Sequence, residues 1–415
     1  MPISISEKLR TGKKLRSKYL LQLYIIQGLF LSAFILPFYY IVDVRATLPD
    51  YWPTNGWQTS KPESQGMSST KLRGLHNYIR DQNLPLDSVI IVRNGYIVYE
   101  DYPSPSYGED NTHILHSVTK SFTSALIGIA IKEGYIGNVN ETVVSFFPNH
   151  TIANLNALKQ AMTIEHLLNM MTGMEWDEWS YPYTDIRNDL IQMIYSGDCV
   201  QFMLDRPMAI EPGTVWLYNT GASHLLAAII KQTTGQTPLQ YASDSLFKPL
   251  GITKRYWTSD QQGLNYGGSE LQLRPRDMAK FGLLYLHNGI WEEEEIVPAW
   301  WINKSRESIV SPWYGTGYGY QWWKNLNLGT YEARGLHNQW IIIDRENNLV
   351  IVFTATDLNG QIDIFHLVSN YILSAIGEFP VDGVKIWEIT LSLTLLIGAS
   401  IVVIVIYFVR KRNKS

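Results

Sequence analysis

Cysteine is almost absent from this 415-residue chain, which contains one, Cys199. A single thiol excludes an intramolecular disulfide and a metal site built from several cysteines. The H-E-x-x-H pattern of helical zinc sites is absent as well. We therefore expect a protein that works without a metal ion or other cofactor.

Charge is also scarce. Charged residues make up 17% of the chain, the formal net charge is -4, and no basic stripe lies outside the two extreme ends. Nucleic-acid-binding domains usually carry clustered lysine and arginine, so nucleic acid is excluded as a partner. Hydrophobic residues make up 46% of the chain, enough for a large core. The partner that we expect is a small-molecule, peptide or ester substrate, because of the Ser117 and Lys120 motif described below.

Two long segments lack charge almost entirely. Residues 19–42 contain no charged side chain, and neither do residues 389–409 within a second apolar segment, residues 386–409. A membrane span needs about 20 such residues. Basic tails, residues 1–18 and 410–415, flank them, and basic flanks stay in the cytoplasm. The pattern predicts two helices in the lipid of the cell membrane, cytoplasmic termini and an extracytoplasmic central domain.

A cleaved signal peptide is the alternative for the first segment, with a cleavage site at Val44–Ala46. The apolar core of a signal peptide is typically about 7–15 residues long, which is shorter than this segment. We therefore favour a retained anchor.

The central region divides by composition. Residues 43–60 are rich in proline, glycine and polar residues and predict a linker, whereas residues 61–380 have the patterning of a globular domain. Alternation of apolar and polar residues predicts two strands in residues 87–102 and two more in residues 339–356. Helical spacing predicts helices that begin or lie near residues 68–82, 118–133, 163–176, 221–234, 276–288 and 364–376. Strands at both ends of the domain predict one antiparallel sheet with an inserted helical lobe, an α+β fold.

A lysine stands out in the apolar helix that follows residue 117. The stretch HSVTKSFTSALIGIAIKEGYIG, residues 116–137, places Lys120 three residues after Ser117. Residues three apart lie on one helix face, and an apolar environment lowers the pKa of a lysine. A neutral amine beside a hydroxyl is a general base that activates serine as a nucleophile. The alternative is a helix-capping serine followed by a surface lysine.

The S-x-x-K pattern occurs twice more. Ser68 to Lys71 opens a helix, where the serine is expected to be a plain cap. Ser245 to Lys248 runs into Pro249, at a helix end. Only the match at Ser117 precedes a long apolar helix, so Ser117 is the candidate nucleophile.

Together with the sequence around it, this S-x-x-K motif resembles that of the serine β-lactamase-related family. This family includes class C β-lactamases, penicillin-binding carboxypeptidases, certain esterases and 6-aminohexanoate-dimer hydrolases. The resemblance extends over about residues 61–376 and is carried by residues 85–102, 116–131, 163–176, 211–235, 249–257 and 275–291. It implies a β-lactamase/transpeptidase-like fold, with an antiparallel sheet flanked by helices, a helical lobe, and the active site between them.

The family's second motif, Y-x-N, is altered. The stretch PGTVWLYNTG places Tyr218 on the tyrosine, and the resemblance implies that Tyr218 shares proton transfer with Lys120. Asn219 follows directly, and Thr220 occupies the place of the usual asparagine, so both are candidate substrate contacts. The alternative for Tyr218 is a core aromatic whose hydroxyl is satisfied internally.

The third motif, K-T-G or H-x-G, is absent in that form. Its place falls in EARGLHNQWIIID, residues 332–344, just before the strand at residues 341–343. His337 is the cationic or hydrogen-bonding candidate, with Gly335, Asn338 and Gln339 as possible lining residues; His337 is equally compatible with a loop position. The resemblance implies that an N–H of this strand completes an oxyanion hole with the N–H of the nucleophile.

These patterns lead to two hypotheses. The first is a membrane-anchored serine hydrolase that cleaves an amide or ester bond through an acyl-enzyme on Ser117, with Lys120 and Tyr218 as general base and acid. The second is a binding or sensor module that uses a similar pocket without turnover, since two motifs are altered.

Overall fold

The computed structural model describes residues 49–307 and 309–377. The two predicted spans and both basic tails lie outside these residues. Within the described part of the chain, no helix is both long and apolar enough to cross a membrane.

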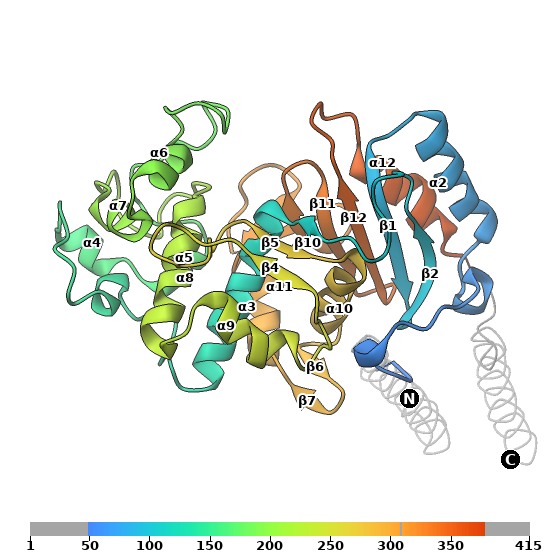
Figure 1. The fold of residues 1–415 in the computed structure, drawn as a ribbon, viewed down its shortest axis with the longest axis horizontal. Helices are drawn as coiled ribbons and strands as arrows, with labels where there is room; N and C mark the ends of the chain where they lie inside the picture. Colours follow the sequence, from blue (N-terminus) through green and yellow to red (C-terminus); the bar gives the residue numbers. More distant parts are fainter. Residues whose placement is uncertain (1–48, 308, 378–415) are drawn as a thin grey trace, which may run out of the picture. The chain divides into compact units, whose positions relative to one another are not determined.

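A seven-stranded antiparallel sheet forms the centre of the described fold (Figure 1). Its order is β2-β1-β12-β11-β10-β9-β8. Strands from the start of the domain therefore pair with strands from its end, which confirms the predicted sheet. The strands are β1 (Leu86–Arg93), β2 (Tyr96–Asp101), β8 (Thr316–Gly319), β9 (Trp322–Asn325), β10 (Thr330–Gly335), β11 (Gln339–Asp344) and β12 (Leu349–Ala355).

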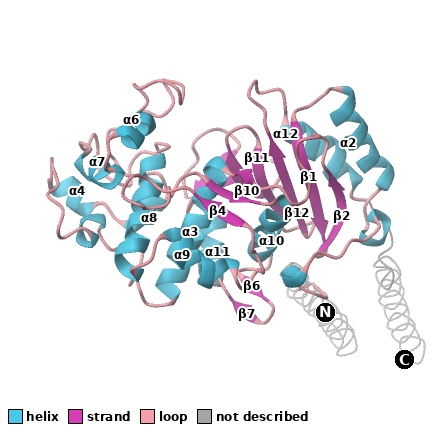
Figure 2. Cartoon of the chain, viewed as in Figure 1, coloured by secondary structure: helices cyan, strands magenta, loops and turns pink. Residues whose placement is uncertain are grey.

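Alternation along the strands gives the sheet two buried faces. On β1, Val89 and Ile91 belong to one apolar cluster, and Ile90 and Val92 belong to the other. Helix α2 (Ser69–Asp81) and the segment beginning with α12 (Ile364–Leu367) cover the first face, whereas α10 (Pro275–Leu286) packs on the second (Figure 2). The segment after α12 continues as irregular helical turns to Ala375, rather than as one regular helix.

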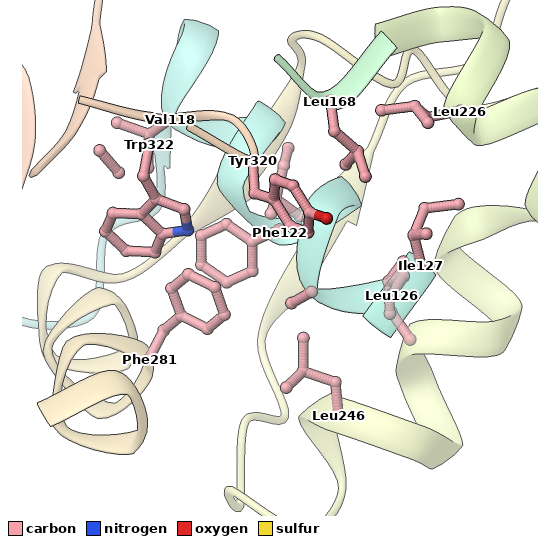
Figure 3. Close-up of a cluster of buried hydrophobic side chains, with 14 of the residues drawn as sticks. Val118, Phe122, Leu126, Ile127, Leu168, Leu226, Leu246, Phe281, Tyr320 and Trp322 are labelled. Carbon is pink, nitrogen blue, oxygen red and sulfur yellow. The ribbon is translucent and has the colours of Figure 1, made fainter. Parts of the chain in front are cut away.

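Helix α3 (Thr119–Lys132) lies in the interior of the helical region. Every residue from Thr119 to Ala130 is buried, which explains why the helix is apolar on all sides. Figure 3 shows side chains from several elements around it. Phe122 stacks on Phe281 of α10 at a centroid distance of 3.7 Å, and the same cluster contains Leu126, Ile127, Leu168, Leu226, Leu246 and Trp322.

The remaining elements are short, apart from α8. The helices are α4 (Ala157–Ala161), α5 (Ile164–Leu168), α6 (Asp189–Tyr195), α7 (Cys199–Asp205), α8 (Thr220–Thr234), α9 (Pro238–Ala242) and α11 (Ala299–Arg306). A small sheet has the order β3-β5-β4, from β3 (His113–Ile114), β4 (Arg255–Trp257) and β5 (Leu271–Leu273). A hairpin pairs β6 (Ile290–Trp291) with β7 (Glu294–Glu295).

Residues 49–60, expected to belong to a linker, pack on the domain. The Tyr51 hydroxyl donates to the Gly95 carbonyl at 2.9 Å, and Trp57 Nε1 donates to the Arg276 carbonyl at 3.0 Å. Thr59 forms a bridge with Ile97 of β2. This part of the sequence therefore has fixed contacts with the sheet and α10.

Candidate active site

Ser117 lies in a 3-10 turn, η3 (His116–Val118), directly before α3. His116 has a φ of +46°, an unusual conformation for a residue with a side chain. Ser117 is therefore at the amino end of the buried helix, where the helix dipole favours negative charge. This position suits a nucleophilic serine, because attack on a substrate carbonyl places a negative charge on the carbonyl oxygen.

Lys120 lies one turn further, with its amine against the serine. Its Nζ is 2.9 Å from Ser117 Oγ and 2.9 Å from the Gly268 carbonyl oxygen. The residue is 2% exposed, and burial lowers its pKa to about 8, although the Glu178 carboxylate acts in the opposite direction. The neutral amine is therefore much more accessible at pH 7 than that of a solvated lysine.

Tyr218 is the third group at this place. Lys120 Nζ lies 4.8 Å from the centroid of its ring. Burial raises the pKa of Tyr218, the negative charge of Glu178 raises it further, and interaction with the Ser117 hydroxyl lowers it. The phenol therefore stays protonated at neutral pH. The directions of the two pKa shifts favour Lys120 as the proton acceptor and Tyr218 as a proton donor.

Glu178 is a member of the site that the sequence analysis missed. It is 3% exposed and accepts hydrogen bonds from Trp176 Nε1 at 2.9 Å and from the Tyr183 hydroxyl at 3.0 Å. It also accepts from the Thr220 backbone N–H at 2.7 Å and from the Thr220 hydroxyl at 2.6 Å. Three acidic residues lie in MEWDEW, and no local signal separates Glu178 from the other two.

The two residues after Tyr218 make contacts within the protein. Asn219 is fully buried, and its side-chain oxygen caps α8 by accepting from the Ala222 N–H at 2.9 Å. Thr220 is 4% exposed, and its hydroxyl is directed to Glu178. Both residues therefore hold the start of α8 in place, and neither presents its side chain at the surface.

The three candidates at the turn between β10 and β11, namely His337, Asn338 and the first residue of β11, Gln339, make different contacts. His337 lies near the nucleophile turn, because its ring is 5.4 Å from the His116 ring and roughly perpendicular to it. Asn338 Nδ2 instead donates to Asp357 Oδ2 at 2.9 Å, and Gln339 Nε2 donates to the Ala355 carbonyl at 2.6 Å. His337 is therefore the member of this group that lies beside the site.

The strand next to the nucleophile is β10, which the sequence analysis did not predict. A Cβ on Gly335, the last residue of β10, would lie 2.4 Å from the Leu115 carbonyl oxygen, so the two backbones touch. The register of β10 with β9 ends at Glu332, which leaves residues 333–335 beside η3. The stretch predicted to hold the third motif, residues 332–344, thus includes the end of β10 with Gly335 as well as the turn at His337 and Asn338, both of which have positive φ.

Two glycines position the lysine. A Cβ on Gly268 would lie 2.6 Å from Thr220 Cγ2 and 3.2 Å from Lys120 Nζ. A Cβ on Gly267 would lie 2.1 Å from the Ser223 carbonyl oxygen. Only glycine allows this segment to approach α8 so closely, and the approach brings the Gly268 carbonyl within hydrogen-bonding distance of Lys120.

A second polar cluster lies within the same lobe. Ligand-type atoms of Cys199, His224 and Asp260 all lie within 4.8 Å of one another. His224 Nε2 is 3.1 Å from Asp260 Oδ2, and Cys199 Sγ donates to the Met193 carbonyl. Burial raises the pKa of Cys199 to about 12, and the Gly267 N–H donates to His224 Nδ1 at 3.4 Å. The cluster is thus satisfied by protein groups.

A family model described as Beta-lactamase matches residues 71–365. The chain belongs to this family. A 6-aminohexanoate-dimer hydrolase from Paenarthrobacter ureafaciens is 22% identical over 335 residues, which cover 74% of this chain and 83% of that protein. Two further curated relatives are matched over 49% and 34% of their own length.

Solved structures agree on the fold. EstCE1, a hydrolase with promiscuous acyltransferase activity, superposes with a TM-score of 0.61 at 15% identity, covering 76% of this chain and 99% of that one. A family VIII carboxylesterase gives a TM-score of 0.58 at 15% identity, with 75% and 98% covered. The protein is thus an enzyme of the serine hydrolase class to which this family belongs, with the β-lactamase-like arrangement of sheet and helices that the sequence predicted.

Proposed function

We propose that this protein hydrolyses an ester or amide bond through an acyl-enzyme on Ser117, with Lys120 as general base and Tyr218 as a proton relay. The contact of 2.9 Å between Lys120 Nζ and Ser117 Oγ carries the proposal. It joins a nucleophile to a buried amine, whose depressed pKa makes the neutral form accessible.

Acylation proceeds in two steps. The neutral amine of Lys120 accepts the proton of the Ser117 hydroxyl while Oγ attacks the substrate carbonyl carbon and its π electrons move to oxygen. The resulting oxyanion receives hydrogen bonds from the Ser117 N–H and from an N–H of the β10 edge. Collapse of this intermediate expels the alcohol or amine, which takes a proton through Tyr218. Water then attacks the acyl-enzyme while the neutral Lys120 accepts its proton through Tyr218, and Lys120 passes that proton to Ser117 Oγ as the acid is released.

Covalent labelling with a fluorophosphonate tests the proposal. Wild-type protein should be labelled on Ser117, and Ser117→Ala should abolish the label without loss of folding. Ser245→Ala is the matched control, since it removes the serine of another S-x-x-K sequence, and it should be labelled normally. A labelled Ser117→Ala variant would refute the assignment. Reversible probe binding by the wild type with no covalent adduct would favour a binding or sensor module instead.

We further propose that residues 19–42 and 386–409 anchor the protein in the cell membrane with the enzyme domain outside the cytoplasm. Their length, the absence of charge from residues 19–42 and 389–409, and the basic flanks support this placement. Protease added to intact cells should digest the domain and spare tags on both termini. Loss of an amino-terminal tag during maturation would indicate a cleaved signal peptide, and a protected domain would contradict the proposed topology.

A further inference from the structure

Five aromatic side chains, here called the aromatic wall, meet beside the candidate nucleophile: Trp179, Trp216, Tyr218, Trp313 and Trp323. The Tyr218 ring stacks with Trp179 at 5.4 Å and with Trp323 at 6.1 Å. Trp313 stacks with the same two rings, at 5.3 Å and 5.4 Å. Trp216 contacts the other four. The wall is therefore one continuous aromatic surface.

The wall reaches from solvent to the reacting groups. Trp179 and Trp313 are 51% and 48% exposed, whereas Tyr218 and Trp323 are 7% and 8% exposed. Lys120 Nζ is 4.8 Å from the Tyr218 ring centroid, and Ser117 Oγ is 2.9 Å from the same amine. Two adjacent half-exposed tryptophans leave apolar area in water that an apolar ligand group would cover. A substrate whose carbonyl carbon lies at Ser117 Oγ would place a neighbouring apolar group on this wall.

One cation beside the wall, Arg334, is already paired. Arg334 of β10 lies with its guanidinium 5.1 Å from the Trp323 ring centroid, but its Nε donates to Glu332 Oε2 at 2.7 Å. Glu332 is fully buried, so separating the pair would leave a buried carboxylate without its partner. The buried Glu178 carboxylate adds negative charge behind Tyr218. A carboxylate on the substrate would lie near the Glu178 charge, and Arg334 would not be available to pair with it.

We infer that the aromatic wall is the specificity subsite of the enzyme, and that it binds an uncharged aromatic or alkyl group of an ester or amide substrate in preference to a carboxylate. This inference rests on the function proposed above and narrows its substrate class.

The experiment uses the full chain in lipid nanodiscs and measures acid release in a pH-stat. Ethyl acetate is the small reference ester, ethyl phenylacetate and benzyl acetate carry a phenyl ring on the acyl and alcohol sides, and monoethyl succinate carries a carboxylate. The wild type should hydrolyse at least one phenyl ester with a kcat/KM about tenfold above that of ethyl acetate, because ring stacking on the wall stabilises its transition state. Monoethyl succinate should be the poorest substrate.

Trp313→Ala should abolish this preference, mainly by raising KM for the phenyl ester, so kcat/KM should fall more for the phenyl ester than for ethyl acetate. Trp179→Ala is the second variant and should act in the same direction. Trp300→Ala is the matched control, since Trp300 is 46% exposed on α11, outside the wall, and it should leave the preference intact.

The outcomes separate the two proposals. An equal loss of kcat/KM for ethyl acetate and for the phenyl esters in the wall variants would overturn the inference. An unchanged preference in these variants, or a preference of the wild type for monoethyl succinate, would overturn it as well. Those results would leave acylation of Ser117 standing. Absence of hydrolysis together with absence of fluorophosphonate labelling in the wild type would instead refute the proposed function, and the inference with it.

Discussion

Two lysines in the helical lobe, Lys120 and Lys159, are both almost fully buried, yet their surroundings differ. Lys159 is 1% exposed, and its Nζ donates to three carbonyl oxygens, those of Leu204, Arg206 and Ala153, at 2.5, 2.6 and 3.3 Å. Three acceptors match the three protons of an ammonium group. Lys159 therefore ties α4 to the end of α7 through these hydrogen bonds, although burial lowers its pKa too.

Lys120 has a smaller set of acceptors. One carbonyl and one serine hydroxyl lie within hydrogen-bonding distance of its amine, and the third neighbour is an aromatic ring. A hydroxyl can donate as well as accept, so the neutral amine is accommodated at this position. Burial alone therefore does not identify a base; the partners of the amine do.

The largest expected effect is on catalysis at Lys120. Lys120→Arg should slow acylation by about a thousandfold, because arginine keeps its charge and cannot accept the serine proton. Rapid-mixing measurement of fluorophosphonate labelling gives the rate. Lys159→Arg, the matched control, should label at the wild-type rate per folded molecule. Equal rates for Lys120→Arg and wild type would make Lys120 a structural lysine like Lys159.

Displacing the carbonyl partner of Lys120 should have a smaller effect. Gly268→Ala places a Cβ 2.6 Å from Thr220 Cγ2, so the segment must move away from the amine. A displacement of about 1 Å near reacting groups costs about a hundredfold in rate. Gly74→Ala is the control, since its Cβ would meet only ordinary contacts, and it should not alter labelling. Unimpaired labelling by Gly268→Ala would show that this carbonyl does not position the base.

Replacing Lys159 and replacing Lys120 by methionine should change the free energy of unfolding in opposite directions. Lys159→Met leaves three carbonyls without a donor and should lower the free energy of unfolding by about 1–3 kcal/mol. Lys120→Met should raise it at neutral pH, because the folded state binds the Lys120 proton less tightly than the unfolded chain. The Lys120 contribution to stability should rise with pH between about 8 and the ordinary lysine value. Urea unfolding measures both, and effects of the same sign would contradict the comparison.

The smallest effect concerns the pH dependence. Glu178 stabilises the Lys120 ammonium, so Glu178→Gln should shift the acylation profile to lower pH. The amide can still accept from the Thr220 N–H and donate to the two hydroxyls, which retains the shape of the site. Asp185→Asn, at a carboxylate paired with Arg187, is the control. A shift to higher pH would show that Glu178 acts on Lys120 in another way.

The sequence was most informative where the relevant contacts are local. Ser117 and Lys120 meet because they are three residues apart at the start of one helix, and the β1–β2 hairpin follows from Asn94 and Gly95, both of which adopt positive φ. Tyr218 came from the family resemblance. The fold class followed from strands at both ends of the domain, which β1 and β12 confirm by pairing.

The parts that could not be predicted depend on contacts between distant segments. Glu178 and Gly268 reach the site only because packing against α8 brings their loops to Lys120. Strands β8 and β9 were not predicted because they are short and because Tyr320 and Gln321 join them. Both residues have positive φ, but neither is a residue type that marks a turn in the sequence. The internal role of Asn219 likewise became visible only with the cap it provides to α8.

The pH dependence of acylation tests the central claim most directly, that Lys120 is the base for Ser117. Labelling rates of wild type and Lys120→Arg should be measured from pH 6 to 10. The wild-type rate should rise with pH, about tenfold per unit below an apparent pKa near 8, and then level off, because only the neutral amine accepts the serine proton. The Lys120→Arg rate should be low and flat. A flat wild-type profile, or the same titration in both proteins, would contradict the account.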